Sequence, residues 1–310
     1  MTDVAPQPLR EDSKDVRDFA RADYPALYDA AAAASRANQK LHTRSARVEL
    51  GLLLLTSALI ALEGWNWIHD RNYGTAIRIA IAITLATALL LKAAIRNRRF
   101  DARWFEARGL AEAVKSQSWQ YMMLLPPYDG GDAVSHAELR QQFNDLMRLY
   151  PSVDEELHRL PTERGQATEG MRAVRALGLA DRRSLYARYR VRDQIDWYRR
   201  NALKSKKQST RWFILGFVVQ LVAVVLAILM VGVGGLPILQ LTVAISIAVT
   251  ALNRSGLSED RSKEYGVAAQ ELSMLLEAVE LTESQEQFAS AVRDLETVIG
   301  KEHSAWFARR

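Results

Sequence analysis

The sequence predicts an all-α membrane protein with two transmembrane helical hairpins, four spans in all, continuous with long cytoplasmic amphipathic helices that form a bundle. Three observations predict this fold. Four apolar runs have the length of a membrane-spanning helix or come close to it. Basic residues gather at the ends of these runs that lie away from the hairpin turns. The other segments repeat apolar residues at helical spacing, and none shows the alternation of a strand.

The composition narrows the class of protein. The chain has 310 residues, of which 49% are hydrophobic, and its mean hydropathy is −0.13. A transporter that lies mostly in lipid would be more apolar, whereas a few spans attached to a large soluble part give such an average. The absence of cysteine excludes a disulfide framework and Cys-ligated metal centres. Residues 1–22 are polar, lack the apolar region of a secretory signal and are expected to form a disordered tail.

Residues 23–128 form the first predicted two-span unit. Its spans cover about 48–68 and 73–95, which is enough helix for the roughly 30 Å of hydrocarbon in a bilayer. The first span ends in Trp65 and Trp67, aromatic residues of the kind that gather at a membrane interface. The sequence therefore predicts one hairpin here, with its turn near these tryptophans.

Arg78 stands out because it lies about one turn inside the second span. A charged side chain in a span is costly unless it reaches the interface or finds a partner. Arg78 therefore either extends toward the hairpin end of the span, or pairs with Glu63, or lines a conduction path.

Residues 181–310 form the second predicted unit, with spans at about 212–234 and 236–252. The first of these spans carries no charge, and Gln220 is its one strongly polar side chain. The second is at the short end of the range for a span. A Gly-Gly-Leu-Pro turn at 234–237 separates the two.

Polar residues mark one face of the last predicted span. Thr242, Ser246 and Thr250 are four residues apart and share a helical face. Gln240 lies on the same span, two residues before Thr242. Such a face meets another helix or water rather than lipid tails, so it is either an inter-span contact or the lining of a pore. The candidate pore or inter-span contacts are Arg78, Gln220, Gln240, Thr242, Ser246 and Thr250.

The basic residues decide the expected orientation. Lys and Arg cluster before the first and third predicted spans and after the second and fourth, whereas the second hairpin turn carries no charge. The positive-inside rule therefore places both termini and the middle region of this multi-pass protein in the cytoplasm. These flanks account for the net charge of +5, so we expect the partners to be the lipid bilayer and not nucleic acid.

Helices are also expected outside the membrane. Helical spacing of apolar residues predicts them over 96–128, 189–209, 261–281 and 284–310, the second running directly into the third span. Residues 129–180 are more polar and read as a cytoplasmic helical insertion or linker.

Aromatic and arginine residues are numerous in these helices. They either pack the interior of the bundle or form a ligand pocket, in which arginines would contact the phosphates of a nucleotide. The candidates for this ligand or packing site are Trp104, Arg108, Trp119, Arg190, Arg192, Gln194, Trp197 and Tyr198.

The two halves are alike in organisation, since each has a Tyr- and Arg-rich helix, a basic junction, an apolar hairpin and a long continuation helix. The segment RWFEARGLAEAVKSQSWQYM after the first hairpin resembles one subgroup of the SLATT domains, the SMODS- and SLOG-associating two-transmembrane effector domains. The segments YRVRDQIDWYRRNA, YGVAAQEL and GKEHSAWFARR around the second hairpin resemble another. The resemblance covers most of the chain except the N-terminal tail and about 130–180.

The resemblance implies two tandem SLATT-like units and a defence effector. Such an effector would oligomerise and perforate or depolarise the inner membrane when infection is detected. The chain shows no evident sensor domain, so the trigger would be a nucleotide second messenger or a separate sensor protein. A non-conducting membrane scaffold that recruits partners and a housekeeping ion channel are the alternatives.

Motifs for catalysis are missing from the sequence. Its five histidines show no i, i+3 or i+4 pair, and it has no phosphate-binding loop and no nucleophile elbow. We therefore expect no enzyme, no cofactor and no metal. Glu296 is interpreted as an ordinary partner of Arg293 or Lys301 on its own helix.

Overall fold

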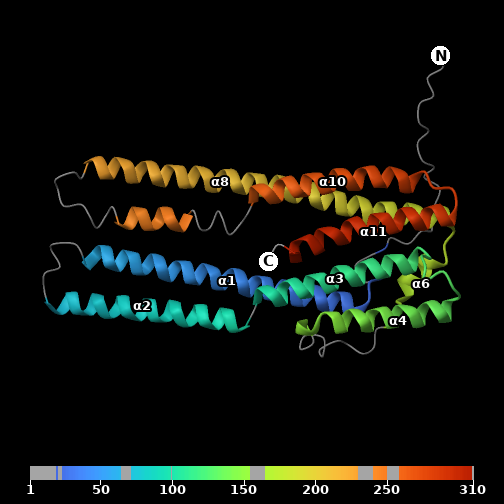
Figure 1. The fold of residues 1–310 in the computed structure, drawn as a ribbon, viewed down its shortest axis with the longest axis horizontal. Coiled ribbons are helices and arrows are strands. Elements are labelled where there is room, and N and C mark those ends of the chain that lie inside the picture. Colours follow the sequence, from blue (N-terminus) through green and yellow to red (C-terminus); the bar gives the residue numbers. More distant parts are fainter. Residues whose placement is uncertain are drawn as a thin grey trace, which may run out of the picture.

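The structure is a computed structural model that describes residues 19, 23–63, 71–98, 100–153, 165–229, 240–249 and 258–308. These residues form helices, and no strand occurs among them. Figure 1 shows an elongated bundle, in which the apolar helices lie at one end and the amphipathic helices at the other. The prediction of an all-α membrane protein is confirmed.

The first half consists of three helices. α1 (Ala26–Glu63) and α2 (Arg71–Arg98) form the hairpin, and α3 (Phe100–Met122) folds back along the first part of α1. Small residues make this contact close, because α1 presents buried Ala31 and Ala34 to the buried alanines of α3. The expected apolar face of 96–128 is thus the face that packs on α1.

The second half repeats this arrangement. α8 (Asp193–Leu229) leads into the membrane part, the ten-residue helix Gln240–Val249 follows, and α10 (Ser258–Glu280) packs back on α8. α11 (Gln285–Ala308) closes the bundle by inserting buried side chains between the two halves. These side chains are Phe288, Val292, Leu295 and Ile299.

Three helices are long and apolar enough to cross a membrane: Ala26–Glu63, Tyr73–Ile95 and Leu179–Leu229. In the last of these, the apolar part begins near Trp212. At most 11% of each apolar window is buried within the protein, so these surfaces are available to lipid or to another copy. The fourth predicted span, at about 236–252, extends beyond the helix Gln240–Val249 into residues outside those described.

The described residues of the segment between the halves form helices, most of which pack on α3 of the first half. It contains α4 (Asp132–Leu149), the short 3₁₀ turn η2 (Pro151–Val153), α6 (Glu169–Arg175) and α7 (Leu179–Leu185). The buried guanidinium of Arg175 holds it in place by donating to three backbone carbonyls, those of Tyr121, Tyr128 and Gly130, at 2.7–2.9 Å.

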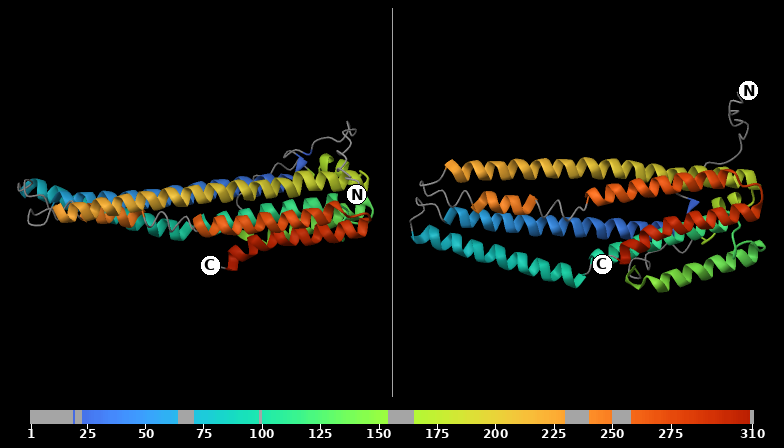
Figure 2. Two further views of the ribbon diagram at one scale, coloured as in Figure 1. Left: turned by 90° about the horizontal axis from the view of Figure 1, so that it is seen from above. Right: turned by 45° about the horizontal axis from the view of Figure 1, so that its top comes forward.

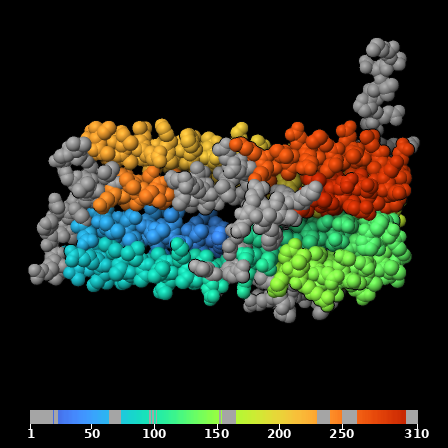
Figure 3. Space-filling model, in the orientation of Figure 1, coloured from blue at the N-terminus to red at the C-terminus, as the bar shows by residue number. Residues whose placement is uncertain are grey.

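The molecule has two different long edges. α8 and α10 run along one edge, and α2 and α4 run along the other, as Figures 1 and 3 show. Figure 2 shows from two further directions that α1 and α8 enter the apolar end from the same side. The two halves therefore point in the same direction, as a parallel repeat does.

Candidate functional site

The two halves meet at a short π-helix. η3 (Tyr186–Arg192) joins α7 to α8 and places Tyr186 and Arg190 on the inner side of the bundle. A π-helix adds a residue to the helical turn, and such turns often occur at functional sites. Here it brings a phenol and a guanidinium toward one carboxylate on α11, that of Glu296.

We call the residues around this carboxylate the junction cluster: Tyr24, Glu112, Tyr186, Arg190 and Glu296. Arg190 is fully buried and binds Glu296 in a bidentate manner, with Nε donating to Oε1 at 2.8 Å and Nη2 to Oε2 at 2.7 Å. The Tyr186 hydroxyl donates to the same Oε1 at 3.0 Å. The third guanidinium nitrogen, Nη1, lies 3.9 Å from Oε2 of Glu112 on α3. The cluster therefore links α3, η3 and α11 through charge.

The surroundings of Arg190 and Tyr186 decide the protonation state of both side chains. Burial by itself lowers the pKa of Arg190, but the adjacent Glu296 carboxylate more than offsets this and raises that pKa overall. Burial, followed by the Glu296 charge, raises the pKa of Tyr186 well above its usual value. The tyrosine therefore remains a neutral donor, and the arginine remains a cation.

A second cation, Lys115, lies beside the cluster. Its Nζ is 6.0 Å from the centre of the Tyr24 ring, and the Tyr24 hydroxyl accepts a hydrogen bond from Trp119 Nε1 at 2.7 Å. Burial, followed by the positive charge of Arg190, lowers the pKa of Lys115. Burial also raises the pKa of Tyr24. The surroundings of Lys115 therefore disfavour its charged form.

The predicted ligand or packing residues fall into separate groups. Trp119 and Arg190 lie at the junction cluster, both fully buried. Trp197 and Tyr198 pack with Tyr265 of α10, with ring centres 5.4 and 5.7 Å apart respectively.

The remaining members of that set lie around these groups. The Arg108 guanidinium lies 5.8 Å from the Trp197 ring centre, and Trp104 stacks on His42. Arg192 instead pairs with Glu280 at the surface, at 2.6 Å, and Gln194 is buried on the inner face of α8.

The predicted membrane residues are placed as follows. Arg78 Nε donates to Glu63 Oε1 at 2.6 Å across the α1–α2 hairpin. Of the alternatives given for Arg78, the structure thus shows the pairing with Glu63. Gln220 and Gln240 are exposed, whereas Thr242 and Ser246 are half-buried. Thr250 lies outside the described residues.

A contact that the sequence did not single out also joins the first hairpin. The Thr56 and Thr84 hydroxyls are 3.0 Å apart and buried between α1 and α2. The structure thus shows both a polar contact and an ion pair between these two helices.

The interpretation of Glu296 as an ordinary partner on its own helix is wrong. Its carboxylate is buried and binds Arg190 from another element. One signal for this was in the sequence, since Glu296 shares the apolar face of Val292, Leu295 and Ile299. An acidic residue on a buried face requires a cationic partner elsewhere.

Within the described residues, no group of three or more His, Asp or Glu side chains is placed to hold a metal ion. The arrangement offers a different property, which is mechanical. A buried ion pair fixes η3 to α11 within the second half, and the same guanidinium lies 3.9 Å from Glu112 of the first half. Each half continues into the apolar part as an unbroken helix.

Comparison with known proteins identifies both halves. Residues 25–183 match the SMODS and SLOG-associating 2TM effector domain 3, and residues 186–306 match the SMODS and SLOG-associating 2TM effector domain 1. The first match takes in the segment 129–180, which the sequence resemblance had left out. No curated protein and no solved structure matches the chain. Domains of this family are associated with defence-system effectors. The chain belongs to the SLATT family and carries two of its two-transmembrane effector domains in tandem.

Proposed function

We propose that this protein is an inner-membrane effector of a bacterial nucleotide-signalling-linked defence system, and that it oligomerises to form a pore or perturb the membrane when triggered. It acts on the membrane and not by catalysing a reaction, with both termini in the cytoplasm. The trigger, a nucleotide second messenger or a separate sensor protein, acts on the cytoplasmic bundle.

The observation that carries this proposal is the continuity of α8. Its 37 residues include 19 before Trp212, in the bundle, and 18 from Trp212 to Leu229, in the apolar part. At 1.5 Å per residue these are about 28 and 27 Å of one helix. α1 spans the same boundary without interruption. A tilt of the bundle therefore moves the membrane helices as levers, a rigid-body change of the kind used in switching proteins.

Two features of the membrane part support assembly of several copies. The apolar windows are almost unburied within one chain, so a single copy has no walls around a conducting path. Gln220 lies in the middle of an apolar stretch with its amide exposed. A polar side chain in lipid is costly, and contact with another copy or with a water-filled path relieves this cost.

The test is membrane potential and dye entry in cells induced to express the full chain, with the genes of a cognate sensor co-expressed. We expect the wild type to depolarise the cells, and Gln240→Leu and Ser246→Leu to reduce this effect. Ile247→Leu is the matched control, because Ile247 is an exposed apolar residue of the same helix. A wild type that leaves the potential intact with the sensor present would overturn the proposal in favour of a non-conducting scaffold.

A further inference from the structure

Basic side chains line the two helices that run from the bundle into the apolar part (Figure 1). Residues 36–47 of α1 and 199–211 of α8 hold ten lysines and arginines and no aspartate or glutamate. Arg47 and Arg211 are each the last basic residue before an apolar stretch. Val48, directly after Arg47, is 54% exposed, so exposed basic surface passes directly into exposed apolar surface. A molecule with a charged head and an apolar tail can bind at such a boundary.

The exposed cations of α8 form a line along one side of the helix. The members of this line, which we call the α8 stripe, are Arg200, Lys204, Lys207 and Arg211, all exposed. Their spacing of four, three and four residues is that of side chains on one helical face. At 3.6 residues per turn, all four lie within about 40° of the direction opposite to Ala202. The Ala202 carbonyl accepts a hydrogen bond from Ser262 of α10 at 2.9 Å, so the stripe faces away from α10.

α1 carries a second line of the same kind. Its members, the α1 stripe, are Arg36, Lys40, Arg44 and Arg47, all exposed. The other exposed positions in this stretch hold uncharged residues, namely Ala37, Gln39, Leu41, Thr43 and Ala46. Buried Ala34 and Asn38 lie on the opposite side of the helix. In each stripe the first and last cations are eleven residues apart, which is about 17 Å of helix.

Carboxylates of the described residues do not neutralise the stripes. Among those residues, none lies at ion-pair distance from any of the eight cations. The nearest acidic residues before the stripes in the sequence are Asp29 and Asp196, seven and four residues away on the side remote from the apolar part. Glu49 follows the α1 stripe but lies on the side of α1 that carries Asn38. The stripes therefore keep their positive charge next to the apolar surface.

The helices beside the stripes pack on the opposite sides of α1 and α8. Residues 258–264 at the start of α10 hold three acidic and two basic residues, and α10 covers the side of α8 away from the stripe. α3 packs on α1, and residues 96–108 around its start hold five arginines and two acidic residues. These neighbours leave the region strongly basic, so it attracts anions.

The place and length of the stripes fit the surface of a membrane. The headgroup layer on each side of a bilayer is about 5–8 Å thick. The attraction between its anionic lipids and a cation falls off over about 8–10 Å at physiological ionic strength. The positive-inside rule requires basic residues on this side of the membrane, but it does not require them on one face of a helix. Their alignment is therefore a separate observation, and it favours a bound anion.

We propose that the α1 and α8 stripes bind the headgroups of anionic phospholipids in the leaflet next to the bundle. Lysine and arginine donate to the phosphate oxygens. The acyl chains of the same molecule lie on the exposed apolar surface that begins near Val48 and Phe213. A free anion meets only the first of these two surfaces, so the occupant is a lipid. The inference rests on α1 and α8 as membrane helices and not on pore formation.

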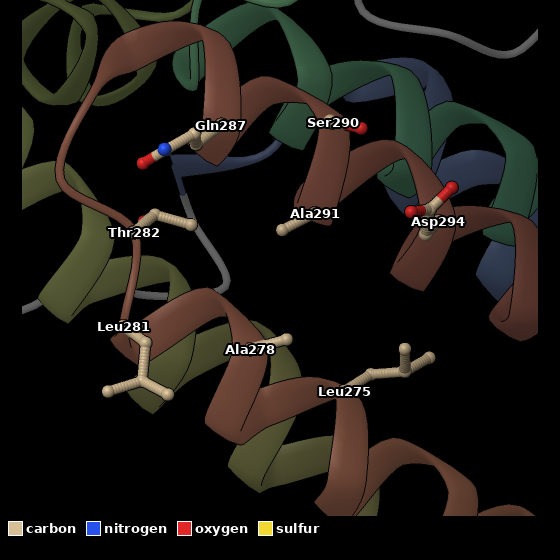
Figure 4. Close-up of a pocket in the computed structure, with 8 residues that line it drawn as sticks. All are labelled: Leu275, Ala278, Leu281, Thr282, Gln287, Ser290, Ala291 and Asp294. Atoms are coloured by element: carbon tan, nitrogen blue, oxygen red, sulfur yellow. The ribbon is translucent and has the colours of Figure 1, made fainter.

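The groove between α10 and α11 does not offer a second site of this kind. It has a volume of about 430 Å³ and lies at the end of the bundle remote from the apolar helices. Figure 4 shows Leu275 and Ala278 of α10 and Ala291 of α11 around this space. Asp294 is the one charged residue among those that line it. The lining of the groove therefore repels an anionic headgroup.

Two double variants separate the stripe from charge in general. Arg200→Gln with Lys207→Gln removes two cations of the α8 stripe. Arg199→Gln with Lys206→Gln is the matched control, because these side chains are also exposed, each lies one residue earlier, and Arg199 donates to Ser273 of α10. Each variant loses one arginine and one lysine at nearly the same distance from the apolar part. The two therefore have the same net charge and the same number of basic residues to orient the chain in the membrane.

The assay is titration of the full chain, purified in a neutral detergent, with phosphatidylglycerol, and bound lipid is measured by native mass spectrometry. A second titration with phosphatidylcholine gives the binding of a lipid without net charge. We expect the wild type and the control variant to bind phosphatidylglycerol alike, and both more tightly than phosphatidylcholine. The α8 stripe variant should bind phosphatidylglycerol about fivefold more weakly, the loss expected for one cation close to the headgroups. Adding Lys40→Gln and Arg47→Gln should weaken binding further.

Three results would overturn the proposal. Equal losses from the two double variants would mean that charge in general, and not the stripe, attracts the lipid. Equal binding of the two lipids by the wild type would mean that the headgroup charge is not recognised. Displacement of phosphatidylglycerol by inorganic phosphate at constant ionic strength would assign the stripes to a free anion. All the replaced side chains are exposed and glutamine has a similar helix propensity, so thermal midpoints are expected to stay unchanged.

The two proposals fail separately. A chain that binds phosphatidylglycerol through the stripes without depolarising cells leaves the stripes standing and overturns pore formation. Depolarisation by a wild type that shows no preference for phosphatidylglycerol leaves the proposed function standing and overturns the stripes.

Discussion

Removal of the carboxylate at position 296 is expected to be among the most destabilising single changes in the cytoplasmic bundle. Glu296→Leu removes both acceptors of Arg190, whose side chain is fully buried and keeps its charge. Loss of one partner of a buried ion pair costs about 3–5 kcal/mol. The Tyr186 hydroxyl also loses its acceptor, which adds to the cost, whereas the Glu112 carboxylate 3.9 Å away offsets part of it. We therefore expect a net loss of about 3–5 kcal/mol.

A second Arg–Glu pair on the same π-helix serves as the control. Arg192 and Glu280 are 2.6 Å apart, but their side chains are 53 and 42% exposed. Exposed pairs contribute about 1 kcal/mol or less, so Glu280→Leu should be nearly neutral. The two variants differ in burial and in the number of hydrogen bonds that the removed carboxylate accepts, which is three for Glu296 and one for Glu280.

The assay is thermal unfolding of the purified chain in detergent, followed by tryptophan fluorescence. Each kcal/mol lowers the midpoint by about 2–4 °C in a chain of about 150–250 residues, and somewhat less in a longer one. The double variant Arg190→Met with Glu296→Leu should recover much of the loss, because no uncompensated charge remains in the core. Equal midpoints for Glu296→Leu and Glu280→Leu would refute the reasoning, as would a double variant less stable than Glu296→Leu alone.

Three further outcomes are expected in the same unfolding assay. Lys115→Met should raise the free energy of unfolding, because burial and the charge of Arg190 both disfavour the charged lysine. The stability of the wild type should rise with pH between the lowered pKa of Lys115 and the ordinary lysine value of about 10.4. The variant should lack this rise. Gly170→Ala should cost about 1–3 kcal/mol, since its Cβ would overlap the side chain of Asp23, whereas Gly266→Ala, which has no atom within 4 Å, should be neutral or stabilising. Thr84→Val should cost about 0.6 kcal/mol through loss of the contact with Thr56, whereas Thr87→Val, whose hydroxyl bonds only within its own helix, should cost less.

The helices and their inner faces were predictable from the sequence because both follow from local pattern. The apolar spacing on 284–310 predicted the side that buries Phe288, Val292, Leu295 and Ile299. Three apolar stretches of span length were likewise recognisable from composition alone.

The junction cluster was not predictable in the same way. Helical spacing shows which residues lie on an inner face, but not which remote helix covers that face. Glu296 and Arg190 are 106 residues apart, and their meeting depends on how α11 crosses the bundle and on the π-turn at η3. The arginines that bind backbone carbonyls, such as Arg175, depend in the same way on turns whose carbonyls point inward.

The fusion of two parallel units in one chain has a consequence for stoichiometry. Every copy contributes one unit of each kind, so any assembly of these chains would hold the two kinds in equal number. Because only the first unit carries α4 and only the second carries α11, a substitution in one is not repeated in the other. The two halves can therefore diverge from each other in sequence and in function. In an assembly of identical single units, every substitution appears in every unit.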